Sequence, residues 1–274
     1  MSLYDIIIKP FVRNKDLDRA SRIVLRFFQI TGKIPGGRFL RRILNNNRPV
    51  GLQREVFCKD FYNPIGLSAG LDINGMLYND LNNLGFSFVQ VGPMNADGIR
   101  TAVEHIQEDT PDDILAVCIN ADYNTAFTLG YDFFDFFVID CRNHNPHPII
   151  EALMDIRRTE PKYKPVIIKL QNDCQGEDLE ALVDFCRING MDGVEAQNIE
   201  HVKTVHNHTK GRFPIIADGP INTAEQAYEM LEAGADLLEV RNGLIKEGPE
   251  FIQHILKYLL NKYKRKDNAS TGRE

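Results

Sequence analysis

The sequence lacks a hydrophobic run long enough to cross a membrane, since no stretch of about 18 consecutive apolar residues occurs in it. Its N-terminus also lacks the charged, then apolar, then small-residue order of a secretory signal peptide. These absences argue against a membrane-spanning or secreted protein. We therefore expect the protein to reside in the cytoplasm.

Cysteine is scarce and irregularly placed. The five cysteines are odd in number, widely spaced and without a CxxC pair: Cys58, Cys118, Cys141, Cys174 and Cys186. This pattern favours neither a disulfide framework nor a structural zinc site. We interpret most of them as small core residues.

Charge is distributed unevenly along the 274 residues. Residues 1–50 hold eleven Lys/Arg against three Asp, a local charge of +8, so the rest must carry −14 to give the net charge of −6. A basic arm thus precedes an acidic body. The 43% hydrophobic content is enough for one large domain with a full core, and we expect no nucleic-acid partner.

The arm, residues 1–50, is predicted to form two short amphipathic helices. In the first, Ala20, Ile23, Val24, Phe27 and Phe28 recur at helical spacing, with arginines on the other faces. The second places apolar residues between positions 39 and 44 on one side, beside further arginines. This hairpin either packs on its own domain or lies on an anionic membrane surface, and periodicity alone does not distinguish the two.

From residue 63 onward, short apolar runs alternate with helical patterns. Eight such runs begin at residues 63, 86, 114, 134, 165, 193, 214 and 237. Helices are predicted between them, including 177–189 and 223–233. The spacing is typical of parallel βα units, so residues 51–262 are predicted to form an α/β fold, a (β/α)8 TIM barrel, with 263–274 as a disordered tail.

Active sites in this architecture lie at the C-terminal ends of the strands. Lys169 closes an otherwise apolar strand, and an ammonium group near a core needs a partner. It would lie against an anion or an electron-rich ring, or would extend to solvent. A phosphate site is expected in the loops after the last two strands, near Gly219 and Gly243.

One string near the fourth strand contains residue types that bind metals. Cys141, His144 and His147 form a C-x-x-H-x-x-H pattern. Pro146 and Pro148 break any helix that would align them, and no acidic residue stands at a recognised spacing. We assign no metal ligands, and keep a metal-using barrel as the least favoured alternative.

Several segments together carry a family likeness. They are "YDIIIKPFVRNKDLDRASRIVLRFFQITG", "FYNPIGLSAGLDINGMLYNDLNNLGFSFVQVG", "PVIIKL", "MDGVEAQN" and "GRFPIIADGPINTAEQAYEMLEAGADLLEVRNGLIKEGP". Over nearly its whole length the chain resembles the class 2 dihydroorotate dehydrogenases, which are membrane-associated and quinone-linked. The resemblance implies FMN across the barrel mouth, oxidation of dihydroorotate to orotate in pyrimidine biosynthesis, and a quinone as acceptor.

The resemblance also assigns roles to residues. Lys169 matches the lysine that supports the reduced flavin, and Asn145 and Asn198 match two asparagines that hold the substrate. The implied cofactor site comprises Ala69, Gly70, Lys169, Gly219, Arg241 and Gly243. Ala69 and Gly70 are small enough for a planar ring to lie against their backbone.

Other positions depart from the family pattern. The catalytic serine falls on Asn143, whose neutral amide cannot accept a proton, and a lysine of the first loop falls on Ile73. Asp218 stands where the family has a small residue. A carboxylate about 4 Å from a phosphate charge costs on the order of 4 kcal/mol, which predicts a weakened FMN site.

Three hypotheses follow for function. The chain is a catalytically impaired or repurposed paralogue, an active flavin dehydrogenase on dihydroorotate or a changed substrate, or a metal-using barrel. We favour the first, because the arm and strands are kept while the mouth is altered at several independent positions. A small-molecule ligand is expected, with localisation in the cytoplasm or peripherally on the inner face of the cell membrane.

Overall fold

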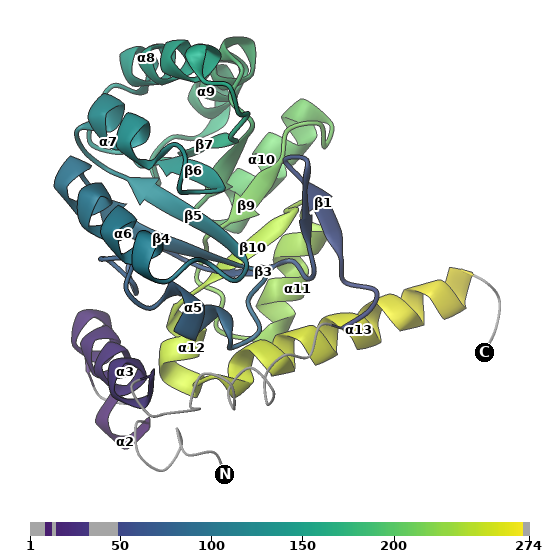
Figure 1. The fold of residues 1–274 in the computed structure, drawn as a ribbon. Coiled ribbons are helices and arrows are strands. Elements are labelled where there is room, and N and C mark those ends of the chain that lie inside the picture. The colour runs from purple at the N-terminus through teal and green to yellow at the C-terminus, as the bar shows by residue number, and fades with distance from the viewer. Residues whose placement is uncertain (1–8, 13–14, 33–48, 271–274) are drawn as a thin grey trace.

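Eight parallel strands close into a barrel in the computed structural model, which describes residues 9–12, 15–32 and 49–270 (Figure 1). The strands are β3 (Ile65–Leu67), β4 (Phe88–Met94), β5 (Ile114–Ile119), β6 (Phe136–Ile139), β7 (Val166–Lys169), β8 (Gly193–Ala196), β9 (Ile215–Ala217) and β10 (Leu237–Val240). They follow chain order around the barrel, which is closed by pairing of β10 with β3. The predicted (β/α)8 TIM barrel is confirmed.

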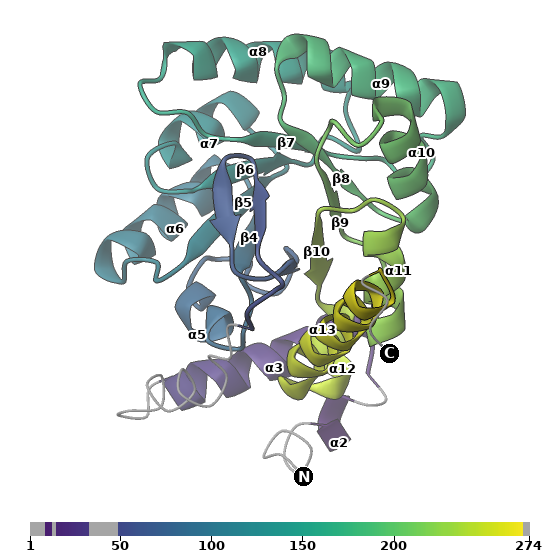
Figure 2. The same ribbon diagram turned by 90° about the vertical axis from the view of Figure 1, so that its right-hand side faces the viewer.

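Helices connect the strands and cover the outside of the barrel (Figure 2). They are α5 (Tyr78–Asn82), α6 (Ala96–Glu108), α7 (Tyr123–Gly130), α8 (Pro146–Thr159), α9 (Gly176–Asn189), α10 (Ile199–Thr209), α11 (Ala224–Glu232), α12 (Asn242–Glu247) and α13 (Glu250–Ser270). At the start of α6, Asn95 caps the helix by accepting a hydrogen bond from the Gly98 backbone N–H at 3.0 Å.

An antiparallel hairpin that the strand count did not predict closes one end of the barrel. It consists of β1 (Arg54–Val56) and β2 (Lys59–Phe61), and Val56 and Phe61 join an apolar cluster with residues of the barrel strands. Phe61 packs edge-on against Phe88 with ring centroids 5.5 Å apart. This apolar layer leaves the opposite, C-terminal end of the strands for polar residues.

The described part of the arm packs on the barrel domain. Its elements are α2 (Lys9–Val12) and α3 (Leu17–Gly32), and α3 lies beside α12 and α5 (Figures 1 and 2). Ala20 and Val24 of α3 are buried in the main core, with Ile23 and Phe27 partly buried against it. Of the two alternatives for this first helix, packing on its own domain describes these side chains.

The second predicted helix of the arm, with its apolar residues between 39 and 44, lies outside the described residues. None of the helices that are described is both long enough and apolar enough to cross a lipid bilayer.

The prediction of a disordered tail over residues 263–274 is wrong as far as Ser270, because α13 continues to that residue. Tertiary contacts explain the difference. The Tyr263 hydroxyl accepts a hydrogen bond from Arg54 at 3.1 Å, and Lys266 pairs with Glu232 on α11. Composition predicted a solvated tail, but one turn of it is held against neighbouring elements; residues 271–274 lie outside the described range.

Candidate functional site

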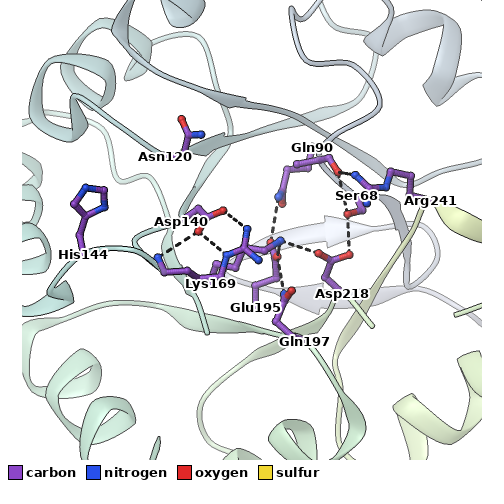
Figure 3. Close-up of polar contacts among 12 residues, drawn as sticks. Ser68, Gln90, Asn120, Asp140, His144, Lys169, Glu195, Gln197, Asp218 and Arg241 are labelled. Atoms are coloured by element: carbon purple, nitrogen blue, oxygen red, sulfur yellow. Dashed lines mark hydrogen bonds and ion pairs between the residues drawn. The ribbon is translucent and has the colours of Figure 1, made fainter. Parts of the chain in front are cut away.

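A layer of polar side chains lies inside the barrel near the C-terminal strand ends (Figure 3). Each strand, or the residue directly after it, supplies one member: Ser68, Gln90, Cys118, Asp140, Lys169, Glu195, Asp218 and Glu239. Two positions before each of them on the chain stands a small or apolar residue that lies deeper in the barrel, such as Phe88, Ala116 or Ile167. Since side chains two apart on a strand share a face, the eight residues point into the barrel together.

Lys169 occupies the centre of this layer. Its ammonium group forms an ion pair with Glu195 and a second one with Asp218, whose Oδ2 lies 2.7 Å from Nζ. Only 7% of Lys169 is exposed. Burial by itself lowers the pKa of Lys169, but the Glu195 and Asp218 carboxylates outweigh it and raise the pKa above its ordinary value. The lysine is therefore charged and fully engaged by acidic side chains.

The two carboxylates that hold Lys169 have further partners of their own. The Ser68 hydroxyl donates to Oδ1 of Asp218 at 2.7 Å. The side-chain amides of Gln90 and Gln197 donate to Glu195 at 3.1 and 3.3 Å. These hydrogen bonds orient both carboxylates toward the ammonium group, so the residues form one connected polar network.

Glu239 completes a set of three carboxylates. One oxygen of each of Glu195, Asp218 and Glu239 lies within 4.8 Å of the others. Glu239 is fully buried, and neither of its oxygens has a hydrogen-bond partner among the described residues. Burial first, then the nearby Glu195 carboxylate, raises the pKa of Glu239 well above its usual range, and burial raises that of Glu195 to about 7. Both shifts favour the protonated acids, and Lys169 already contacts the other two members of the set.

A cavity of about 190 Å³ opens above this cluster. It is lined by Ser68, Ala69, Gly70, Pro93, Cys118, Asp140, Arg142, Lys169, Gln197, Asp218 and Arg241. Arg142 forms a two-point ion pair with Asp140, with nitrogen to oxygen distances of 2.7 and 2.6 Å. Sites for drug-sized ligands usually enclose about 300–1,000 Å³, so this cavity suits a smaller group.

Arg241 covers the backbone that was predicted to receive a planar ring. Its Nη1 donates to the Ala69 carbonyl oxygen at 3.1 Å. A Cβ added to Gly70 would lie 1.9 Å from the same nitrogen. The guanidinium group thus fills the space over Gly70. With Arg241 in this arrangement a flavin ring does not fit against Gly70, because the ring and the guanidinium group would need the same volume.

The residues assigned to base and substrate contacts are not brought to this cavity. Among the described residues, its lining includes none of Asn143, Asn145 and Asn198. Asn143 is exposed in the loop before α8. The Asn145 side chain caps α8 by accepting from the His147 N–H at 3.2 Å, and Asn198 caps α10 by accepting from the His201 N–H at 2.9 Å. Helix capping accounts for both amide oxygens.

The two glycines assigned to a phosphate site also have packing contacts. A Cβ on Gly243 would lie 2.2 Å from the Phe251 ring, and one on Gly219 would lie 2.7 Å from the Cε of Met230. Neither glycine lines the cavity, as far as the chain is described. Of the predicted cofactor residues, the structure brings together Ala69, Gly70, Lys169 and Arg241.

The residues of the C-x-x-H-x-x-H string lie in different environments. Cys141 is buried, and burial raises the pKa of its thiol to about 11. His144 contacts the Tyr123 hydroxyl at 3.2 Å, whereas the His147 ring packs on Phe185 with centroids 4.2 Å apart. Each histidine ring thus has a protein contact of its own.

Sequence reasoning missed Gln90, Glu195 and Glu239. A signal for them existed, because each is a polar residue inside a short apolar run: "FVQVG", "GVEAQ" and "LLEVR". Attention to strand ends alone passed over them, since each lies inside its strand, before the last strand residue.

Sequence and structure comparisons identify the relatives of this barrel. The profile of the family described as dihydroorotate dehydrogenase matches residues 188–262. A dihydroorotate dehydrogenase (quinone) from Christiangramia forsetii is 26% identical over 342 aligned positions, covering 95% of this chain and 99% of that protein. Over nearly its whole length the chain is thus similar to proteins named dihydroorotate dehydrogenase. A Haemophilus ducreyi protein of the same name is 23% identical, covering 94% of this chain and 99% of that one.

Solved structures agree at the level of the fold. A ligand-free dihydroorotate dehydrogenase from Eimeria tenella matches with a TM-score of 0.73 at 18% identity, covering 91% of this chain and 95% of that chain. A complex of the enzyme from the same organism with ferulenol matches with a TM-score of 0.70, again at 18% identity, covering 83% and 91%. The 342 positions aligned with the Christiangramia protein exceed the 274 residues of this chain, so that protein carries insertions that the chain lacks.

Proposed function

We propose that this chain is a dihydroorotate dehydrogenase-like barrel that has lost efficient dihydroorotate oxidation and has been kept as a small-molecule-binding paralogue. The activity of the family is the starting point, because the relatives are named dihydroorotate dehydrogenase (quinone). The proposal concerns which catalysis and which ligand binding the C-terminal end of this barrel supports.

The engagement of Lys169 carries the proposal. A cation supports a reduced, negatively charged ring only if its charge is available to that ring. Here Glu195 and Asp218 take two contacts of the ammonium group, and Asp218 faces the cavity with its own negative charge. Negative charge that develops on a bound ring would therefore lie near the Asp218 carboxylate and near a lysine whose positive charge is already compensated by two acidic side chains.

A missing base supports the same conclusion. The resemblance places Asn143 where the family has its serine, and an amide cannot take a proton from the substrate. The thiol of Cys118 lines the cavity, but burial raises its pKa well above the usual range, so it is not ionised at neutral pH. Loss of a general base typically reduces rates by about 10²- to 10⁴-fold.

The test is a side-by-side assay with an active quinone-type dihydroorotate dehydrogenase. The purified chain is supplied with excess FMN, dihydroorotate and a soluble quinone, and orotate formation is followed. We expect a rate at least about 10²-fold below that of the active enzyme. Turnover within tenfold of it would overturn the proposal in favour of a working dehydrogenase.

We also propose a cytoplasmic protein whose basic arm can meet the inner face of the cell membrane. Arg19, Arg22 and Arg26 of α3 are exposed, while the apolar side of the helix packs on the barrel domain. Exposed arginines on one arm are attracted to anionic lipid headgroups. A quinone, the acceptor in the names of the relatives, would be reached from that surface.

A further inference from the structure

Ala69 and Gly70 line the cavity, and we call their backbone on the cavity side the ring seat. Gly70 has a φ of +97°, which favours glycine, and its N–H donates to the Gly92 carbonyl at 2.7 Å. Ala69 is the only side chain of the pair and is small. The ring seat is therefore held rigidly and presents no side chain larger than a methyl group.

Arg241 reaches the ring seat from the end of the neighbouring strand, β10. It directly follows β10, two positions after Glu239, and β10 pairs with β3 next to the ring seat. Its Nη1 donates to the Ala69 carbonyl oxygen at 3.1 Å, and a Cβ built on Gly70 would lie 1.9 Å from the same nitrogen.

The guanidinium group is well suited to this position. It is planar, delocalised and weakly hydrated, so it lies against flat surfaces as an aromatic ring does. Asp218 lines the same cavity, but its two oxygens are engaged by Lys169 and Ser68. The contact with the Ala69 carbonyl therefore places the arginine on the backbone and away from the main ion-pair network.

We propose that Arg241 is the residue that closes the ring seat and excludes planar heteroaromatic ligands from the barrel mouth. The guanidinium occupies the volume that a ring would take, and the remaining cavity of about 190 Å³ is smaller than usual ligand sites. Shortening the side chain opens the ring seat. This assignment does not depend on the proposed loss of turnover, since it concerns binding of a ring.

The experiment uses lumiflavin, a flavin ring without phosphate, as the probe, which separates the ring seat from any phosphate contact. Fluorescence of the probe is titrated with wild-type protein, Arg241→Ala and Arg241→Gln. We expect at least about tenfold tighter binding by Arg241→Ala than by the wild type, equivalent to about 1.4 kcal/mol. Arg241→Gln should also gain affinity, because it too lacks the guanidinium, and it serves if the alanine variant does not fold.

Arg142→Ala is the matched control. Arg142 lines the same cavity and carries the same charge, but its guanidinium is bound to Asp140 and does not cover Gly70. We expect lumiflavin affinity within about threefold of the wild type for this variant. The proposal is overturned if Arg142→Ala gains as much as Arg241→Ala, if the folded Arg241 variants gain nothing, or if the wild type binds as tightly as they do.

Discussion

The Nζ of Lys169 lies 2.7 Å from the Oδ2 of Asp218, and the same ammonium group pairs with Glu195. The lysine comes from β7 and its partners from β8 and the end of β9, so three consecutive strands build the contact. A residue that the sequence assigned to a bound ligand is thus part of an internal ion-pair network. The contribution of Lys169 to this network, and the protonation of the acidic residues in it, can both be measured through the stability of the fold.

Lys169→Met should strongly destabilise the fold. The substitution leaves Glu195 and Asp218 without their cation in a buried site, and breaking a buried pair in this way costs about 3–5 kcal/mol. Urea unfolding measures the loss. Lys203→Met is the control, because Lys203 pairs with Glu200 on the surface, and it should cost no more than about 1 kcal/mol. Equal effects of both variants would contradict the buried network.

The stability of the wild type should fall as pH rises from about 4.5 to about 7. The pKa of Glu195 in the folded protein is about 7 against an ordinary value of 4.5, and burial raises that of Glu239 further. In this window the folded state binds more protons than the unfolded state, so raising the pH favours unfolding.

Glu239→Gln removes one of these groups and mimics its protonated form. We expect this variant to be at least as stable as the wild type near pH 8, with a flatter dependence of unfolding free energy on pH. Denaturant unfolding at several pH values from about 5 to 8 measures both. Glu104→Gln, at an exposed position on α6, should leave the curve unchanged. A variant that is less stable than the wild type near pH 8 would indicate an ionised, paired Glu239.

Under the proposed loss of activity, Asn143→Ser alone should not restore dihydroorotate oxidation. The serine supplies a hydroxyl at the position of the family base, but Lys169 stays bound to two carboxylates and Arg241 stays over Gly70. We expect orotate formation with excess FMN to remain within about threefold of the wild-type rate, well inside the 10²- to 10⁴-fold effect of a working base. A gain of a hundredfold would show that the base was the sole deficiency.

Gly243→Ala and Gly219→Ala should differ in cost if these glycines are kept for packing. The new Cβ at position 243 would meet the buried Phe251 ring, which cannot move freely, and overpacking costs about 1–3 kcal/mol. The Cβ at position 219 would meet only the flexible end of Met230, so we expect a smaller loss. Thermal or urea unfolding measures the loss of stability in each variant. A larger loss for Gly219→Ala than for Gly243→Ala would argue against the packing role.

Replacement of Arg22 and Arg26 by alanine should weaken sedimentation of the protein with anionic vesicles. Both side chains are exposed, and each basic residue near such a surface contributes about 1 kcal/mol. Binding should also weaken as salt is raised. Replacement of the exposed Lys257 on α13 by alanine is the control. Wild-type protein that ignores vesicles at low salt would mean that α3 only packs on the barrel.

The strand positions were predictable because parallel strands of a barrel are buried on both faces and leave short apolar runs at regular spacing. All eight predicted runs contain or adjoin an observed strand, and helices 177–189 and 223–233 agree with α9 and α11 within a residue. The β1–β2 hairpin and the last turns of α13 were missed. Both depend on contacts with segments distant in the sequence, such as Tyr263 with Arg54.

The site was only partly predictable. Lys169, Ala69, Gly70 and Arg241 were named from their places at strand ends and from a family likeness, and they do line one cavity. The sequence could not predict in which direction each of the predicted side chains points. Asn145 and Asn198 turn to their own helices as caps, and Glu195 and Glu239 enter from a layer below the loops.

The sequence by itself determined the barrel, because burial of apolar strands at a repeated spacing has few other solutions, and it determined which polar residue types reach the mouth. Only the tertiary structure decided their partners. Lys169 pairs with Glu195 and Asp218 because neighbouring strands hold them in register, and Arg241 covers Gly70 because β10 closes onto β3. Charge pairing in a buried site depends on distances of a few ångströms, which no spacing along the chain encodes.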